Sequence, residues 1–236
     1  MAEEARETSL IAAALKRAPL FADLPSSILA ELCAMSRIER HGQGKVLYQV
    51  GESVAGLYIV ATGVLENGLL QAKGRRFVLA YVPPGDFAGM VPTLDEQAAL
   101  TDIRAHTDVT VVLIPRGPLR ASLEREPKLL FRFTLELCQN VRRYGLHIWR
   151  LAMLGLRQRC AHALLSLASS YGHSTAAGID IELKVSQDDL AAMLSVSRQR
   201  VNTELRSLVA EGVVKARYSH ITILDQKRLA AIAGGR

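Results

Sequence analysis

The side chains best suited to chemistry lie close together in the last third of the chain. Arg198 and Arg200 carry guanidinium groups, which donate two parallel hydrogen bonds in a fixed fork. Gln199 and Asn202 carry amides, which both donate and accept. A guanidinium matches O6 and N7 of guanine, and an amide matches N6 and N7 of adenine. With Thr203, these residues could read base pairs if one helix presented them together.

The flanking sequence predicts two helices joined by a tight turn. Ser186 is the expected N-cap of the first helix, whose first turn carries two carboxylates, and Ser197 caps the second, which ends at Gly212. The turn itself is Ser195–Val196. The apolar positions of the two helices are Leu190, Ala191, Leu194, Val201, Leu205, Leu208 and Val209. This pattern predicts a helix-turn-helix, with the polar first turn of the second helix facing away from the apolar stripe.

The net charge of +6 is unevenly distributed along the chain. Lys and Arg against Asp and Glu number 13 against 15 over residues 1–126, 5 against 1 over 127–156, and 11 against 7 over 157–236. Residues 213–225 then predict two short strands about a tight turn, a wing that carries Lys215, Arg217 and His220. A basic second half favours contact with a polyanion there.

The region from residue 41 to 115 has a different rhythm. Short apolar stretches alternate with glycine and proline, which is typical of an antiparallel β-sandwich or barrel. Before it, residues 26–35 have helical spacing, with Ser26 as the expected N-cap. The sequence therefore predicts a β-domain covered by a short helix, and an α+β chain as a whole.

A long helix is expected from Pro127 onward, since apolar residues recur at alternating spacings of four and three. Proline suits the first turn of a helix, where its missing N–H costs nothing. The predicted seam consists of Leu130, Leu137, Val141, Tyr144, Ile148 and Leu151. Such a seam predicts a parallel two-fold dimer; the alternative is that the helix packs only on its own domain.

Membrane and disulfide classes are disfavoured. No apolar run reaches about 18 residues, and the first residues are acidic where a signal peptide would be basic. Cys33, Cys138 and Cys160 are odd in number and far apart, which favours reduced thiols in a cytoplasmic protein.

In its order of parts the chain resembles the Crp/Fnr family of bacterial transcription regulators. The resemblance runs from about Pro19 to Leu229 and rests on VSQDDLAAMLSVSRQRVNTELRSLVAEG, PPGDF and GESVAGLYIVATGV. It implies a double-stranded β-helix (jelly-roll) sensor domain, similar to cyclic-nucleotide-binding domains, over residues 1–126. It further implies a dimerisation helix over 127–156, a winged helix-turn-helix DNA-binding domain over 157–236, and RNA polymerase as a further partner.

The resemblance also divides the DNA contacts. The expected base-reading residues are Arg198, Gln199, Asn202 and Thr203, and the expected phosphate contacts are Gln187, Ser197, Arg200 and Lys215. Many family members have Glu where this chain has Gln199, and Arg where it has Thr203. A carboxylate only accepts, whereas an amide suits adenine, so we expect a half-site that departs from the common family sequence.

The loop PPGDFAGMVPTLDEQAALTDIRAHT, residues 83–107, occupies the place of the family's cyclic-nucleotide cassette. The family uses a Glu for the ribose and an Arg-Ser pair for the phosphate, since a buried anion requires a cation or several N–H donors. Here these positions are Met90, Ala99 and Leu100, and Arg104 belongs to the following strand. The sequence therefore argues against cyclic AMP. The candidate effector pocket comprises Gly89, Met90, Val91, Ala99, Leu100 and Tyr144.

The residue types also bear on other kinds of sensor and on enzymatic activity. An iron–sulfur cluster needs four thiolates, which the chain lacks. Haem needs an axial ligand such as His41, His106 or His147, and a thiol switch would use Cys138. An apolar or neutral effector, no effector, and a cyclic-nucleotide or haem-responsive member with a divergent pocket all stay open. No nucleophile stands beside a base and no metal-ligand spacing is present, so the sequence predicts no enzyme.

Overall fold

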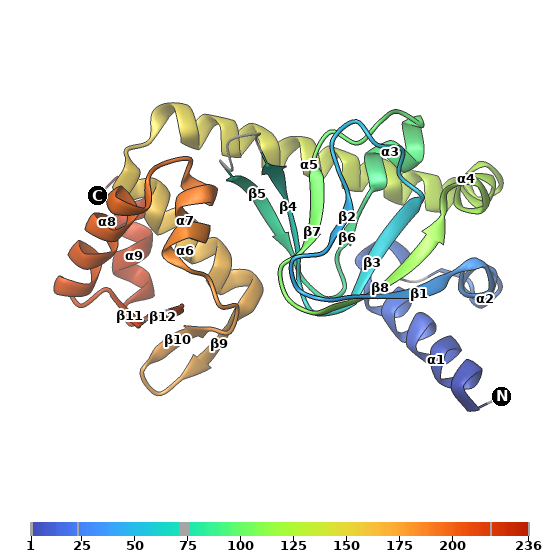
Figure 1. Cartoon of the computed structure of the whole chain (residues 1–236), viewed down its shortest axis with the longest axis horizontal. Coiled ribbons are helices and arrows are strands. Elements are labelled where there is room, and N and C mark those ends of the chain that lie inside the picture. The colour runs from blue at the N-terminus through green and yellow to red at the C-terminus, as the bar shows by residue number, and fades with distance from the viewer. Residues whose placement is uncertain (1, 23, 71–75, 218, 236) are drawn as a thin grey trace. The chain divides into compact units, whose positions relative to one another are not determined.

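The computed structural model describes residues 2–22, 24–70, 76–217 and 219–235, and Figure 1 traces them. The chain divides into two compact units. Unit 1 comprises residues 1–70 and 79–141, and unit 2 comprises residues 71–78 and 142–236. Within the described part of the chain, no helix combines the length and apolar composition needed to cross a bilayer.

Two antiparallel four-stranded sheets form the β-roll, which belongs to unit 1 except for the first residues of its strand β5. The first has the order β1 (Arg37–His41), β8 (Val109–Pro115), β3 (Gly56–Thr62) and β6 (Phe87–Ala88). The second has the order β2 (Val46–Tyr48), β7 (Asp102–Ala105), β4 (Leu65–Leu70) and β5 (Arg76–Val82). Alternate residues of β8 point to opposite faces, so its buried valines and leucines serve two apolar clusters. The predicted jelly-roll and the α+β class are confirmed.

The cluster inside the roll, the roll core, lies between the two sheets. It contains Tyr48, Val54, Tyr58, Val60, Leu65, Val82, Ala88, Ala99, Ile103, Ala105, Val109, Val111 and Leu113. Its two tyrosine rings are tilted against each other, with centroids 5.8 Å apart. This interior is therefore largely filled by the chain's own side chains.

The second cluster, the helix-side core, lies on the outer face of the first sheet. Helical elements cover that face: α1 (Ala2–Arg17), the 3-10 turn η1 (Pro19–Phe21), α2 (Ser26–Met35), α3 (Met90–Asp95), α4 (Arg116–Arg125) and the start of α5 (Pro127–Met153). Leu57, Ile59, Val112 and Ile114 of the sheet pack against them. The helix over residues 26–35 is confirmed, but its predicted cap is wrong. Pro25 is the N-cap and Ser26 is already helical, so no side chain caps it.

Helix α5 begins at Pro127, as predicted, and carries a wide exposed apolar stripe. Val141 is 69% exposed and Ile148 is 66% exposed, and Leu130 and Tyr144 are exposed as well. Leu137 differs from the prediction, because it packs against the helix-side core. Apolar residues outside the predicted seam are exposed as well, on another side of the helix: Phe131, Leu135, Leu146, Trp149 and Met153.

Unit 2 contains the predicted helix-turn-helix and wing. Its helices are α6 (Leu156–Tyr171), α7 (Gln187–Leu194), α8 (Arg198–Ala210) and α9 (Gln226–Ala233). Its sheet has the order β11 (Val214–Arg217), β12 (His220–Ile223), β10 (Gly178–Ile181) and β9 (Gly172–Thr175). The two wing strands are therefore joined to a second hairpin, β9–β10, which the sequence did not indicate.

Candidate nucleic-acid interface

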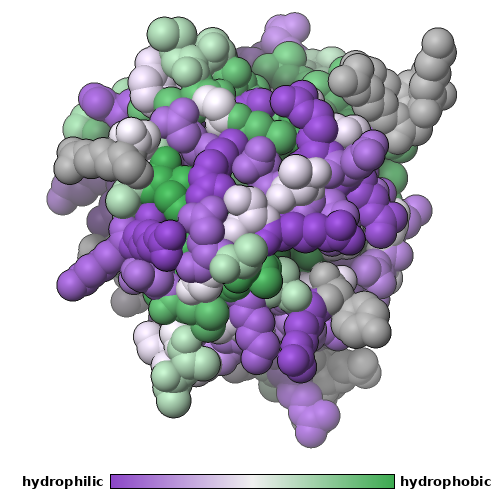
Figure 2. All heavy atoms as spheres, turned by 90° about the vertical axis from the view of Figure 1, so that its left-hand side faces the viewer, coloured by the Kyte–Doolittle hydropathy of each residue, from purple (hydrophilic) through white to green (hydrophobic). Residues whose placement is uncertain are grey.

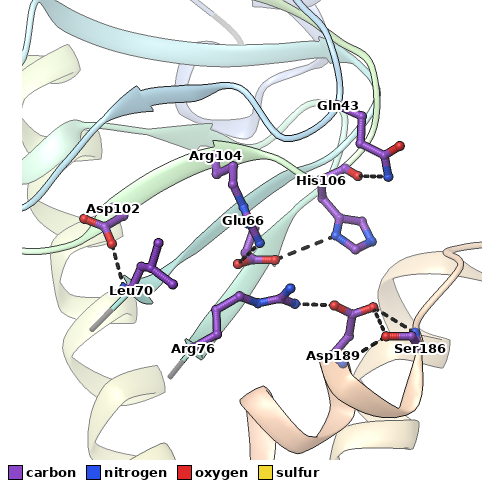
Figure 3. Close-up of polar contacts among 9 residues, drawn as sticks. All are labelled: Gln43, Glu66, Leu70, Arg76, Asp102, Arg104, His106, Ser186 and Asp189. Carbon is purple, nitrogen blue, oxygen red and sulfur yellow. Dashed lines mark hydrogen bonds and ion pairs between the residues drawn. The ribbon is translucent and has the colours of Figure 1, made fainter. Parts of the chain in front are cut away.

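A reciprocal capping box fixes the start of α7. Ser186 Oγ accepts from the Asp189 backbone N–H at 3.1 Å, while Asp189 Oδ2 accepts from the Ser186 N–H at 2.8 Å and from its hydroxyl at 2.7 Å (Figure 3). Burial raises the pKa of Asp189, but the hydrogen bonds from Ser186, together with the Arg76 guanidinium, outweigh it, so the pKa lies below its usual range. The carboxylate stays charged and holds the helix end in place.

The turn between the helices has a defined backbone. Ser195 adopts the left-handed conformation, with φ of 54°, and the Val196 N–H donates to Ala191 O at 3.1 Å. Arg159 of α6 donates from Nη1 to Leu194 O at 3.1 Å, which satisfies a carbonyl at the end of α7. Ser197 then accepts from the Arg200 N–H at 3.4 Å and caps α8, as predicted.

Helix α8 buries one face and exposes the other. Val201, Leu205 and Leu208 are buried, so the residues at the opposite side of the helix face outward. Gln199, Thr203 and Arg206 are exposed and lie four and three residues apart, on one side of the helix. Arg206 was missed by sequence reasoning, although its spacing from Gln199 and Thr203 could have indicated it.

A polar chain links α7 to the exposed start of α8. Arg198 Nε donates to Gln187 Oε1 at 3.5 Å, and Gln187 Nε2 donates to Asn202 Oδ1 at 3.3 Å. Arg198 Nη1 also lies 3.5 Å from Asp188 Oδ2. Three of the predicted DNA-contacting residues, Gln187, Arg198 and Asn202, are therefore brought together, and a fourth residue, Asp188, joins them.

The residues predicted to contact phosphate are all accessible to solvent, at least in part. Ser197, Arg200 and Lys215 are exposed, and Gln187 is half-buried. Figure 2 faces the end of the chain that carries α8 and α9, and hydrophilic side chains predominate on it. Such a surface suits a charged, hydrated partner better than an apolar ligand.

The far end of α8 is held by arginines from neighbouring helices. Arg157 of α6 donates to Ser207 Oγ at 2.9 Å and to Glu211 Oε1 at 2.6 Å. Arg228 of α9 donates to Glu211 O at 2.9 Å. The hydrogen bond from Arg157 is the main reason why the pKa of Glu211 is lowered. These contacts fix the helix at both ends and leave its outer face open.

The cassette loop packs against other residues of unit 1. Gly89 has φ of 86°, and a Cβ there would lie 2.7 Å from Gly56 O, so glycine is required. Met90 begins α3 (Met90–Asp95), is 4% exposed and packs in the helix-side core. This differs from the predicted pocket, because the side chain belongs to the other apolar cluster and not to the roll core.

The other predicted pocket residues are dispersed. Ala99 is buried in the roll core, and its backbone N–H donates to Glu52 O at 2.9 Å. Leu100 is 71% exposed and Val91 lies at the surface of α3. Tyr144 is on α5 in unit 2, where burial raises its pKa. Of the predicted pocket, Ala99 therefore lines the interior of the roll, and Leu100 does not.

Arg104 lies on the outer face of the second sheet. Its strand neighbours Ile103 and Ala105 belong to the roll core, so strand alternation turns Arg104 outward. There it donates from Nη2 to Glu66 Oε1 at 2.8 Å, across the β4–β7 pair (Figure 3). Arg104 is therefore a cross-strand ion-pair partner, and its guanidinium does not enter the roll.

The Asn67 amide faces the roll core. Asn67 pairs with Ile103 in the β4–β7 register, so both side chains lie on the inner face. Among the described residues, Asn67 Oδ1 is buried without a hydrogen-bond partner. A buried carbonyl left unpaired costs free energy, so this position favours a partner that donates a hydrogen bond. Sequence reasoning missed it, because the inner face is known only from the strand register.

The cysteines lie on three different helices. Cys33 is half-buried in α2, Cys138 is exposed on α5 and Cys160 is buried in α6. Burial raises the pKa of Cys160 to about 12, so its thiol stays protonated at physiological pH. Cys138 alone among them has an exposed side chain.

Comparison with known proteins agrees with this arrangement. Residues 38–126 match the cyclic nucleotide-binding domain, and residues 158–232 match the Crp-like helix-turn-helix domain. The transcriptional regulator SdrP of Thermus thermophilus is 30% identical, over 76% of this chain and 84% of that protein. The cyclic AMP receptor protein of the same organism is 27% identical, over 94% and 99%. A crystal structure of a CRP/FNR family regulator from Thermus thermophilus superposes with a TM-score of 0.71, at 28% identity, covering 84% of this chain and 98% of that one.

Proposed function

The chain belongs to the Crp/Fnr family of transcription regulators, and we propose that it binds a pseudo-palindromic DNA site as a homodimer. The observation that carries this proposal is the polar first turn of α8, which is exposed and joined to α7 through Gln187, Arg198 and Asn202. In a helix-turn-helix, the first turn of the second helix enters the major groove. The same relatives are regulators and not enzymes.

The exposed stripe of α5 supports the dimer. A contiguous apolar surface on a helix is costly in water, and a second copy of the same helix would cover it. Val141 and Ile148 are its most exposed members in the predicted seam, and Leu130 and Tyr144 belong to it. We retain the division into a sensor domain (1–126), a dimerisation helix (127–156) and a DNA-binding domain (157–236), with RNA polymerase as a further partner.

The side chains of α8 indicate what the half-site contains. Arg198 is placed to take a guanine through O6 and N7, and Gln199 to take an adenine through N6 and N7. Thr203 and Asn202 complete the base-facing set, while Gln187, Ser197, Arg200 and Lys215 contact phosphates. Two-fold symmetry then places two half-sites about one turn, ~34 Å, apart.

DNA binding is tested with a duplex enriched from a random pool by the unaltered protein, called the selected duplex below. Fluorescence anisotropy is expected to show that it binds about 10³-fold or more tightly than a scrambled duplex of equal length. The affinity for both should fall as salt rises, because phosphate contacts release counterions. Equal affinity for the two duplexes would refute sequence-specific recognition.

We further propose that cyclic AMP is not the effector. No cation from the cassette enters the roll, since Arg104 pairs with Glu66 on the outer face. Met90 packs in the helix-side core, and the Ala99 N–H is bonded to Glu52. A neutral and otherwise apolar effector with one hydrogen-bond donor for Asn67 Oδ1 fits these groups better. The alternative is a cyclic-nucleotide or haem-responsive member with a divergent pocket.

Thermal unfolding tests the effector proposal. About 1 mM cyclic AMP is expected to leave the midpoint unchanged, whereas a ligand at 100 times its dissociation constant would add ~2.7 kcal/mol to the stability. Cyclic GMP and haem are added in parallel, and calorimetry checks each result. A clear upward shift with cyclic AMP would contradict the interpretation of the cassette.

A further inference from the structure

Asp188 places a carboxylate beside the residue that is to read the bases. Its Oδ2 lies 3.5 Å from Arg198 Nη1, and the two side chains are 65% and 66% exposed. The adjacent Asp189 forms the capping box with Ser186, so the cap of α7 does not use the Asp188 carboxylate. An exposed acid at the edge of a DNA-binding surface repels phosphate, and its position therefore requires a reason.

The guanidinium of Arg198 is held at two points. Nε donates to Gln187 Oε1 at 3.5 Å, and Nη1 faces Asp188. Gln187 is itself fixed through Nε2, which donates to Asn202 Oδ1 at 3.3 Å. These contacts leave Nη2 and the second hydrogen of Nη1 available. Those two groups form the fork that a guanine edge accepts at O6 and N7.

The charge of the pair matters as much as its geometry. In the free protein an exposed ion pair is worth only about 0.2–1 kcal/mol. When DNA displaces water from this surface, the local dielectric falls, and both the attraction to Arg198 and the repulsion from phosphate increase. An arginine whose charge is balanced by Asp188 adds little to counterion release, so it gains little from random DNA.

We propose that Asp188 is a positioning residue that determines specificity. Its carboxylate orients the Arg198 guanidinium toward the base edge and keeps it from contacting the phosphates. The inference rests on the proposed DNA-binding function, and its ligand class is a guanine-containing half-site in duplex DNA.

The test is Asp188→Asn, which keeps the shape of the side chain and removes its charge. Dissociation constants are measured for the selected duplex and for a scrambled duplex over a range of salt concentrations. The scrambled duplex should bind more tightly to the variant, and the ratio between the two constants should fall by about tenfold. The salt slope on scrambled DNA should steepen by about one unit per protomer, because Arg198 is then free to take a phosphate.

Two further variants separate positioning from net charge and from folding. Asp188→Glu retains the carboxylate and should restore most of the ratio. Glu182→Gln removes one negative charge from another exposed position of unit 2, and it should leave the ratio unchanged. An unchanged ratio in Asp188→Asn would overturn the inference, as would an equal loss of both affinities with a lower unfolding midpoint. If the unaltered protein itself fails to discriminate, the proposed function fails as well.

Discussion

Arg198→Ala is expected to abolish most of the discrimination between the selected duplex and scrambled DNA. Each bidentate contact with guanine is worth about 1–3 kcal/mol, and a dimer makes two. The affinity for the selected duplex should therefore fall by about 30-fold to 10⁴-fold, while the affinity for scrambled DNA changes much less. Anisotropy titrations at one fixed salt concentration measure both.

The matched control is Lys227→Ala. Lys227 is an exposed cation of α9 in the same unit, outside the proposed interface, so its loss removes the same charge without removing a base contact. The control should keep the full ratio. Full discrimination in Arg198→Ala would show that another residue reads the bases.

Ile148→Asp is expected to convert the dimer into monomers. Ile148 is one of the two most exposed residues of the predicted seam of α5, so a dimer through that seam would bury two carboxylates against each other there. An unpaired buried charge costs at least about 3 kcal/mol, a factor above roughly 100 in the dimer constant. Sedimentation velocity measures the assembly. Affinity for the selected duplex should fall with it, because one monomer holds only one half-site.

Thiol labelling provides a second readout of the same variant. Cys138 lies on the exposed side of α5, so a dimer should protect it, and Ile148→Asp should accelerate its labelling. Cys160 is the internal reference, because it is buried and its pKa is about 12. Val50→Asp places the same charge at another exposed apolar site and should leave the dimer intact. A dimeric Ile148→Asp protein would place the interface elsewhere.

The helix-turn-helix could be predicted from sequence because its determinants are local. Ser186 and Ser197 cap helices as expected, and the apolar spacing identifies the buried face of α8. The polar chain through Gln187 and Asn202 could not be predicted, since it depends on the angle between α7 and α8. Asp188 looked like a helix-end charge alone until its distance to Arg198 was known.

In unit 1, by contrast, local sequence does not determine the site. The alternation of short strands predicts a roll, but it does not say which face each side chain takes. The sequence predicts Met90 as a pocket residue because it replaces the family's Glu, yet the start of α3 directs it into the helix-side core. Leu137 fits the heptad as well as Val141 does. In the structure Leu137 packs against the helix-side core, whereas Val141 is exposed. Tertiary packing decides such positions.

The effector proposal also depends on which face of the sheet each side chain takes. In the sequence, Arg104 is the nearest cation to the positions of the family's Arg-Ser pair, and its place in a strand favours an outward structural charge over a phosphate clamp. The β4–β7 register turns it outward and turns Asn67 inward, which replaces a charged candidate with a neutral one. Proteins with the same roll can thus bind different ligands, because the position of a residue in its strand decides whether its side chain faces the interior.

The pattern that the protein selects from a random duplex pool tests dimeric DNA recognition through α8 most directly. Sequencing of the enriched duplexes should reveal an inverted repeat, with half-site centres about one helical turn, ~34 Å, apart, and a guanine in each half-site. That guanine should lose its constraint when the selection is repeated with Arg198→Ala. Enriched duplexes without two-fold symmetry, or no enrichment at all, would contradict a dimeric regulator that reads DNA through α8.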